Sequence, residues 1–174
     1  MRAVVVFESM YGATHAVASA IAEGLAPLGD VDVVAVADTA DVAFADADLV
    51  VVGGPTHMHG LASARTRALA VHAAEKHAEL ELEPTATAEP GLREWLATCD
   101  GSGRRAAAFD TRFDKPAFLT GAASHVIARR LRHAGYSLVA EPESFLVTPE
   151  GALADGEAAR ARVFGAELAA HVAD

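Results

Sequence analysis

The sequence has few of the residues on which several classes of protein depend. Cysteine occurs once in 174 residues, which excludes an internal disulfide and suits a reducing cytoplasm. Lys and Arg number 14 against 24 Asp and Glu, and the net charge of -10 argues against nucleic acid and anionic membrane surfaces as partners. No apolar run approaches the ~20 residues that a membrane span needs. We therefore expect a cytoplasmic protein with no membrane span and no nucleic-acid partner.

Several motifs of catalysis and nucleotide binding are also missing. There is no G-x-x-x-x-G-K-[ST] loop for a triphosphate, no G-x-G-x-x-G for a dinucleotide and no G-x-S-x-G for serine hydrolysis. The eight histidines offer only two close pairs, His57 with His59 and His72 with His77, so we expect no metal site. Cys99 stands beside an acidic residue, which raises a thiol pKa, and we interpret it as structural.

The opening of the chain is its most informative stretch. An apolar run at residues 3–7 leads directly into the hydroxyl-bearing segment Ser9-Met10-Tyr11-Gly12-Ala13-Thr14, and an amphipathic helical pattern follows at once. The free N–H groups and the positive dipole end of such a helix attract anions. No arginine lies in the segment, so binding would depend on backbone N–H groups and on the hydroxyls of Ser9 and Thr14, which suits a monoester phosphate. The alternative is that Thr14 only caps the helix.

Strand-like runs alternate with helical patterns along the rest of the chain, which is typical of a parallel sheet with crossover helices. The expected strands cover residues 3–7, 31–36, 49–52 and 106–109, with a last pair of runs at 136–139 and 145–147. The expected helices after the first cover residues 61–80, 91–98, 121–133 and 155–172. The pattern predicts one doubly wound α/β domain, residues 1–174, with a five-stranded parallel sheet. Residues 80–90 fit as a surface insertion, with a lid over the ligand as the alternative.

Two further segments leave strands at the edge of the sheet where the first loop lies. In an open parallel sheet, ligands bind at the carboxyl ends of the strands. The third strand ends in Gly53-Gly54-Pro55-Thr56-His57-Met58-His59-Gly60, and the fourth ends in Phe109-Asp110-Thr111-Arg112-Phe113. Both segments mix polar groups with flat or soft side chains, as a planar ring system requires. Each alone is compatible with an ordinary turn, but together with the first loop they predict one ligand crevice.

These residues resemble a known family. The run V-V-F-E-S-M-Y-G-A-T resembles the phosphate loop of the flavodoxin-like family, usually T/S-x-T/S-G-x-T, and G-G-P-T-H-M-H-G resembles that family's second flavin loop. The S-M-Y-G run is similar to the quinone reductases once called Trp-repressor-binding proteins. The stretches A-A-F-D-T-R, P-E-S-F-L-V and G-A-L-A-D-G-E-A-A-R-A-R are similar to a group of bacterial flavodoxin-domain proteins. The resemblance covers nearly the whole chain.

The resemblance implies a sheet of order 2-1-3-4-5 and FMN as the cofactor. The residues implied to hold the ribityl phosphate are Ser9, Met10, Tyr11, Gly12, Ala13 and Thr14. Those implied to flank the isoalloxazine ring are Pro55, Thr56, His57, Met58, His59 and Gly60 in one loop, and Phe109, Asp110, Thr111, Arg112 and Phe113 in the other.

The sequence departs from the family at two places. Tyr11 stands where many flavodoxins carry Ser or Thr, and the aromatic residues that sandwich the flavin in electron carriers are not evident. Arg112 is positioned to stabilise an anionic reduced flavin, so we expect a less extreme reduction potential than that of a low-potential carrier. His57 or His59 would either donate a proton to a quinone oxygen or only cover the ring edge.

Three functions remain open. The expected one is an FMN-binding redox protein that acts in electron transfer with a redox protein partner. The second is an FMN-dependent oxidoreductase that takes hydride from NAD(P)H and reduces quinone-like small acceptors. The third is a fold relative without FMN that serves as an interaction module. The phosphate loop argues against the third function and the open flavin loops favour the second. A glycine-rich run typical of the quinone reductases is replaced by D-T-R-F-D-K, which counts against the second.

Overall fold

A computed structural model describes residues 1–57, 60–77 and 80–173. Its parallel sheet has the order β2-β1-β3-β5-β6, and β4 pairs antiparallel with β3 while β7 pairs parallel with β5. The strands are β1 (Arg2–Phe7), β2 (Asp30–Ala35), β3 (Leu49–His57), β4 (Gly60–Leu61), β5 (Arg105–Phe113), β6 (Ser137–Leu138) and β7 (Glu143–Val147). The predicted doubly wound α/β sheet is therefore confirmed.

The fifth position of the sheet is shared by β6 and β7. β6 pairs with Arg105 and Ala106, near the start of β5, and β7 pairs with the last five residues of β5. The residues between them include Pro142, which has no N–H to donate to a neighbouring strand. The two predicted runs are thus two halves of one edge position, and the predicted order 2-1-3-4-5 holds.

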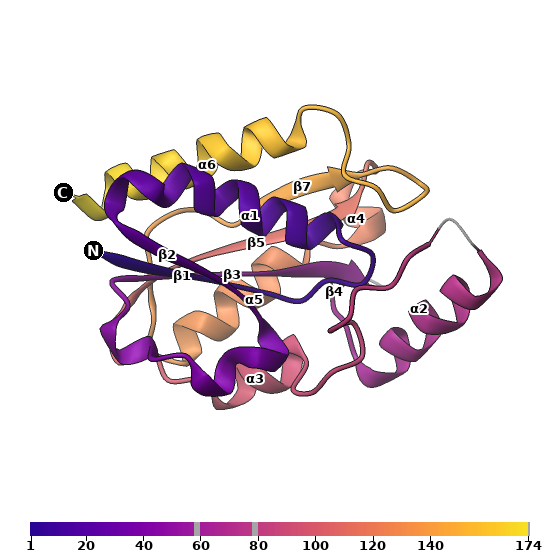
Figure 1. The fold of residues 1–174 in the computed structure, drawn as a ribbon, viewed down its shortest axis with the longest axis horizontal. Helices are drawn as coiled ribbons and strands as arrows, with labels where there is room; N and C mark the ends of the chain where they lie inside the picture. The colour runs from indigo at the N-terminus through magenta and orange to yellow at the C-terminus, as the bar shows by residue number, and fades with distance from the viewer. Residues whose placement is uncertain (58–59, 78–79, 174) are drawn as a thin grey trace.

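Helices cover both faces of the sheet. The long helices are α1 (Ala13–Leu25), α2 (Ala64–Lys76), α3 (Leu92–Thr98), α5 (Ala123–His133) and α6 (Glu157–Ala173), with a short α4 (Ala117–Thr120). In Figure 1, α1 and α6 lie on one face, and α3 and α5 lie on the other. The central strands are buried on both faces, and alternate residues of each enter one of two hydrophobic cores. No helix in the described residues is long and apolar enough to cross a membrane.

The contact between α1 and α6 depends on two glycines. A Cβ atom on Gly24 would fall on the carbonyl oxygen of Arg162, and one on Gly165 would fall on the carbonyl oxygen of Ile21. Only residues without a side chain let the two helix backbones approach this closely. The contact fixes α1, and with it the loop that precedes α1.

Several predicted helix boundaries were wrong. The helix expected over residues 61–80 begins at Ala64 and ends at Lys76. It begins later than expected because Leu61 lies in β4, where it pairs with Thr56 of β3, and because Ser63 is the N-cap of the helix. The cap is reciprocal: Ser63 Oγ accepts from the Thr66 N–H, and Thr66 Oγ1 accepts from the Ser63 N–H. The helix expected from residue 121 begins at Ala123.

The segment that follows α2 packs against the first loop. α2 extends past the carboxyl ends of the strands (Figure 1), and the chain then returns to α3. On its way the backbone N–H of Glu83 donates to the Met10 carbonyl at 2.8 Å. Met10, Ala70 and Ala86 form a small buried cluster with Tyr11 and Leu82 at its edge. The segment expected as a surface insertion thus forms part of the wall of the first loop.

Candidate functional site

The first loop joins a buried strand to the start of α1. Ser9 Oγ accepts a hydrogen bond from the Gly12 N–H at 3.1 Å, which closes the loop into a tight turn. Gly12 is the N-cap of α1 with φ 92°, a backbone conformation that favours glycine. The first N–H groups of a helix have no partner within the helix. Those of Ala13 and Thr14 therefore offer an anion-binding site at the positive end of the α1 dipole.

Thr14 does not cap α1, so that alternative is wrong. Its hydroxyl lies 2.7 Å from the hydroxyl of Thr111 near the end of β5, and both side chains are buried. α1 has no side-chain cap at all. The pair joins the first loop to the fourth strand of the predicted sheet, across the crevice expected from the sequence.

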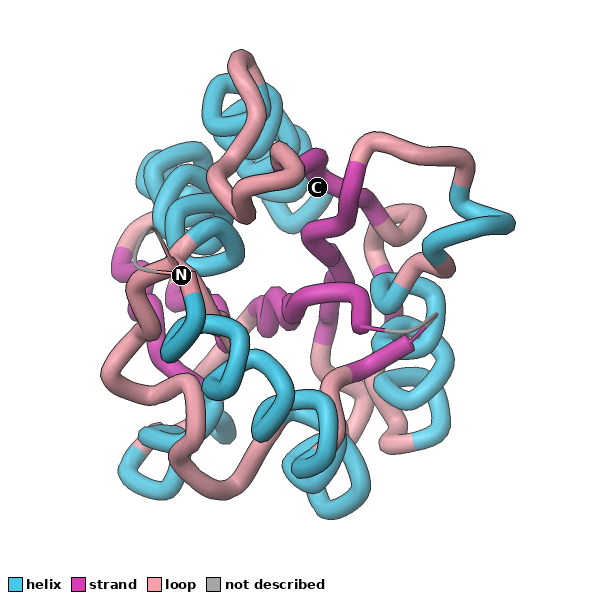
Figure 2. Tube along the Cα trace, turned by 90° about the vertical axis from the view of Figure 1, so that its right-hand side faces the viewer, coloured by secondary structure: helices cyan, strands magenta, loops and turns pink. Residues whose placement is uncertain are grey.

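A cleft of about 210 Å³ lies at this edge of the sheet, where β1, β3, β5 and β7 end. Figure 2 faces this edge, with the carboxyl ends of the strands toward the viewer. The predicted site residues that line the cleft are Ser9, Met10, Tyr11, Ala13, Thr14, Pro55, Thr56, His57, Thr111, Arg112 and Phe113. Most of the surface that faces the cleft is apolar, as binding of a planar ring requires.

Other predicted site residues lie elsewhere. Gly12 borders a second hollow beside Glu83, and Gly60 belongs to β4. Phe109 is fully buried in the core, where its ring packs edge-to-face on Phe145 with centroids 6.2 Å apart. Met58 and His59 lie outside the described residues.

Asp110 supports the cleft from behind. Its buried carboxylate accepts from the Thr56 hydroxyl at 2.8 Å and from the Ser124 N–H at 2.9 Å. The Thr56 hydroxyl in turn accepts from the Ala123 N–H at 2.8 Å. This network fixes the end of β3 against the end of β5 and the start of α5.

Two polar groups of the cleft wall have unused hydrogen-bonding atoms. Burial lowers the pKa of His57, so its imidazole is neutral near pH 7, and its Nε2 has no partner among the described residues. Arg112 donates from Nη1 to the Lys115 carbonyl at 2.6 Å, while its Nε has no partner among the same residues. Such unpaired atoms are costly unless a ligand uses them, so the wall fits a ring with a polar edge.

Sequence reasoning missed one wall of the cleft. This wall is formed by Leu80, after α2, and by Val147, Pro149, Glu150 and Gly151, after β7. The turn after β7 is closed by bonds from the Thr148 N–H to the Ala152 carbonyl and from the Gly151 N–H to the Thr148 carbonyl. The P-E-G run at the end of the last strand was a signal for this turn, since all parallel strands end at one edge. Leu80 begins the segment for which a lid over the ligand was the alternative to a surface insertion, and it lines the cleft.

Tyr11 faces α2. Its hydroxyl donates to the Ala70 carbonyl at 2.8 Å, and partial burial raises its pKa. The aromatic residue of the first loop thus holds α2 in place, and its ring edge lies next to the turn at Gly151.

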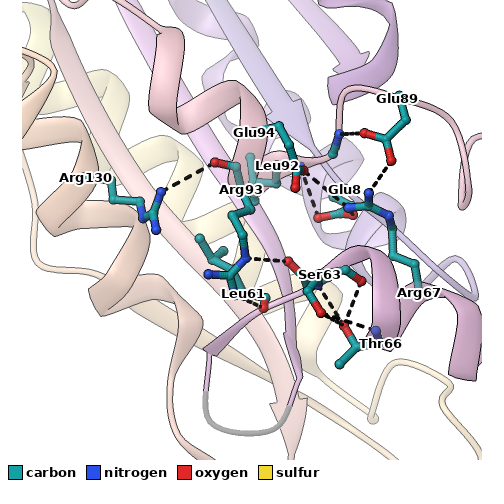
Figure 3. Close-up of polar contacts among 12 residues, drawn as sticks. Glu8, Leu61, Ser63, Thr66, Arg67, Glu89, Leu92, Arg93, Glu94 and Arg130 are labelled. Carbon is teal, nitrogen blue, oxygen red and sulfur yellow. Dashed lines mark hydrogen bonds and ion pairs between the residues drawn. The ribbon is translucent and has the colours of Figure 1, made fainter.

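A buried ionic cluster anchors the return from α2, and it too was missed from the sequence. Figure 3 shows the Arg67 guanidinium between Glu8, Glu89 and Glu94, with distances of 3.3 Å to Glu8 and 3.5 Å to Glu94. Arg67 is 3% exposed and Glu8 is 5% exposed. Burial raises the pKa of Glu8, while Arg67 and the Leu92 N–H, 3.3 Å from its carboxylate, oppose that rise. Glu8 directly follows β1, so the cluster ties α2 and α3 to the base of the first loop.

Cys99 lies at the end of α3 and is half-buried. Burial raises the pKa of its thiol, and Asp100 adds to the rise, as its acidic neighbour predicted. It therefore remains a poor nucleophile. No group of three or more metal-ligating side chains occurs in the part of the chain that the structure describes.

Comparisons with known proteins identify the fold to which this architecture corresponds. Residues 4–86 match the flavodoxin domain family. An archaeal flavodoxin superposes with a TM-score of 0.64 at 22% identity over the whole of both chains. Flavodoxin 1 from Bacillus cereus gives 0.66 at 20% identity, covering 98% of this chain and 99% of its own. A flavodoxin, WrbA-like protein from Agrobacterium tumefaciens gives 0.61 at 21% identity, covering 99% and 97%. No curated protein sequence matched.

The molecule thus has the flavodoxin-like fold. Residues 4–86, which include the segment from Ser9 to Thr14, carry the sequence features of a flavodoxin domain, and the predicted resemblance to that family is confirmed. A flavodoxin domain implies a flavin cofactor.

Proposed function

We propose that the protein binds FMN in the cleft and acts in electron transfer as a flavodoxin-type redox protein. The observation that carries the proposal is the turn from Ser9 to Thr14, which brings the start of α1 to the edge of a cleft with a mostly apolar surface, where β1, β3, β5 and β7 end. This turn falls within the residues that match a flavodoxin domain. We also propose the cytoplasm as its location, since the chain has one cysteine.

Different groups of the chain would bind the phosphate and the ring of FMN. The N–H groups of Ala13 and Thr14 would hold the phosphate, and the Thr14–Thr111 pair fixes the position of these N–H groups. Pro55, Phe113 and Val147 would give the flavin ring apolar contact, and His57 and Arg112 would offer hydrogen bonds to its polar atoms. FMN, when bound, supplies one-electron and two-electron transfer.

Titration of the purified protein with FMN tests the proposal through the quenching of flavin fluorescence. We expect tight binding that Thr14→Ala weakens by about tenfold, since the substitution removes the hydroxyl and releases the first turn of α1. Thr39→Ala is a matched control, because Thr39 is also a buried threonine but donates to the Val36 carbonyl, away from the cleft. A wild-type protein that does not bind FMN at micromolar concentration would contradict the proposal and leave the interaction module as the better account.

A second candidate is an NAD(P)H-dependent quinone reductase. It is favoured by the open mouth of the cleft, where Phe113 is 47% exposed and available to a planar acceptor, and by the likeness to a WrbA-like protein. Steady-state oxidation of NAD(P)H with a quinone by the FMN-loaded protein separates the two functions. Turnover with the quinone supports the reductase. Negligible oxidation, with electron exchange only through a reductase protein, supports the carrier.

A further inference from the structure

Residues 81–86 hold the carboxylate of Glu83 beside the first loop. The Glu83 N–H donates to the Met10 carbonyl at 2.8 Å, and the Ala86 N–H donates to the Glu83 carbonyl at 3.0 Å. Ala86 is buried against Met10 and Ala70. The backbone of Glu83 is therefore held on both sides, and its side chain has a defined position.

The Glu83 carboxylate lies at the N-terminus of α1. Its Oε1 is 3.0 Å from Nδ1 of His15, in the first turn of the helix, and the His15 ring stacks on Phe7. The same oxygen would be 3.4 Å from a Cβ on Gly12, the N-cap residue. The Glu83 side chain is only 19% exposed, so water screens it less than a surface carboxylate.

In this position the Glu83 carboxylate would repel an anion bound at the N-terminus of α1. An anion bound to the N–H groups of Ala13 and Thr14 would lie closer to Glu83 than about 10 Å, the Debye length at 0.1 M salt. A phosphate monoester carries nearly two negative charges at neutral pH, and no Lys or Arg occurs between residues 8 and 14 to offset them. His15 offsets the Glu83 charge only when its ring is protonated.

We propose that Glu83 is a specificity-determining residue of the cofactor site. Its carboxylate repels the phosphate of FMN and thereby lowers the affinity for FMN relative to the affinity for riboflavin. The proposal rests on the proposed function. The proposal concerns the charge of one side chain. Riboflavin is the matched ligand, since it has the same ring and ribityl chain as FMN but no phosphate. The two flavins therefore separate electrostatic effects from effects on the shape of the cleft.

The variant Glu83→Gln tests the proposal with little change in shape. The amide oxygen still accepts from His15, and the backbone bond to Met10 does not involve the side chain. Glu75→Gln is a matched control, because Glu75 also pairs with a histidine, His72 at 3.2 Å, but on the exposed face of α2. Wild type and both variants are titrated with FMN and with riboflavin at low and high salt, and binding is measured by flavin fluorescence.

We expect Glu83→Gln to tighten FMN binding about three- to tenfold at low salt, with riboflavin binding unchanged and a smaller gain at high salt. Glu75→Gln should leave both affinities at the wild-type values. An equal change for both flavins, weaker FMN binding, or unchanged FMN binding by Glu83→Gln would overturn the inference while wild-type FMN binding keeps the proposed function. Failure of all three proteins to bind either flavin would overturn both.

Discussion

The hydroxyl of Thr14 lies 2.7 Å from the hydroxyl of Thr111, although 97 positions separate them in the sequence. One residue belongs to the first turn of α1 and the other to the end of β5, so a single hydrogen bond joins the first loop to the loop expected beside the flavin ring. Both side chains are nearly inaccessible to water, at 2% and 4% exposed. The bond therefore couples the two halves of the proposed site.

Loss of this bond should lower stability as well as FMN affinity. Thr111→Val keeps the shape of the side chain but leaves the buried Thr14 hydroxyl without its partner. We expect a loss of about 1–3 kcal/mol in the free energy of unfolding, measured by urea denaturation of the protein without flavin. FMN affinity should fall in the same variant. An unchanged unfolding midpoint would show that water replaces the missing partner.

The Arg67 cluster should contribute more to stability than an exposed ion pair. Arg67→Met removes the cation that compensates the buried Glu8 carboxylate, so we expect a loss of about 3–5 kcal/mol in the free energy of unfolding at pH 7. The double variant Arg67→Met with Glu8→Gln should recover part of this loss, because no charge is then left unpaired. Arg162→Met, which breaks an exposed pair with Glu23, is the control and should cost less than about 1 kcal/mol. Equal losses in the two single variants would contradict this assignment.

The α1–α6 contact gives a third prediction. Gly165→Ala places a methyl group on the carbonyl oxygen of Ile21, and we expect it to cost about 1–3 kcal/mol by forcing the helices apart. Gly60→Ala is the control, since no atom of the described residues lies within 4 Å of its added Cβ. Thermal unfolding monitored by circular dichroism compares the two. A Gly165→Ala variant as stable as wild type would mean that the helices separate at no cost.

Much of this architecture could be predicted from the sequence because it depends on local patterns. Residues 49–52 read as a strand because both faces of β3 are buried, which gives an unbroken apolar run. The first loop read correctly because strand, turn and helix follow one another directly. The start of α2 was missed because the capping residue at its third position is Thr66, in place of the usual Glu or Gln.

The remaining features depend on contacts between distant residues. Arg67 is 59 positions from Glu8, and no local pattern announces that pair. Leu80 reaches the cleft only because the chain returns along the first loop after α2. The error at Phe109 was different in kind: alternate residues of a strand face opposite sides, and β5 continues to Phe113, so Phe109 lies within the strand and points into the core.

Arg112 should raise the reduction potential of bound FMN. Its cation, held at the cleft by the Lys115 carbonyl, favours the reduced, anionic flavin over the neutral oxidised form. Arg112→Gln should therefore shift the midpoint potential to more negative values in an equilibrium titration against a reference dye. Lys115→Gln, an equal change of charge at an exposed neighbour outside the cleft wall, should shift it less. A potential unaffected by Arg112→Gln would remove this residue from the electrostatics of the site.

His57 should make the folded protein less stable as the pH falls below 6.5. Burial lowers its folded-state pKa below the ordinary 6.5, so between these two values the unfolded chain binds more protons than the folded one. The contribution of His57 is therefore complete above pH 6.5 and is lost as the pH falls toward the folded-state pKa. His57→Gln cannot titrate, so the difference in unfolding free energy between wild type and the variant should shrink or reverse below pH 6.5. Urea unfolding at several pH values between 5 and 8 measures this difference, and a constant difference would show that the imidazole is as well solvated in the folded protein as in the unfolded chain.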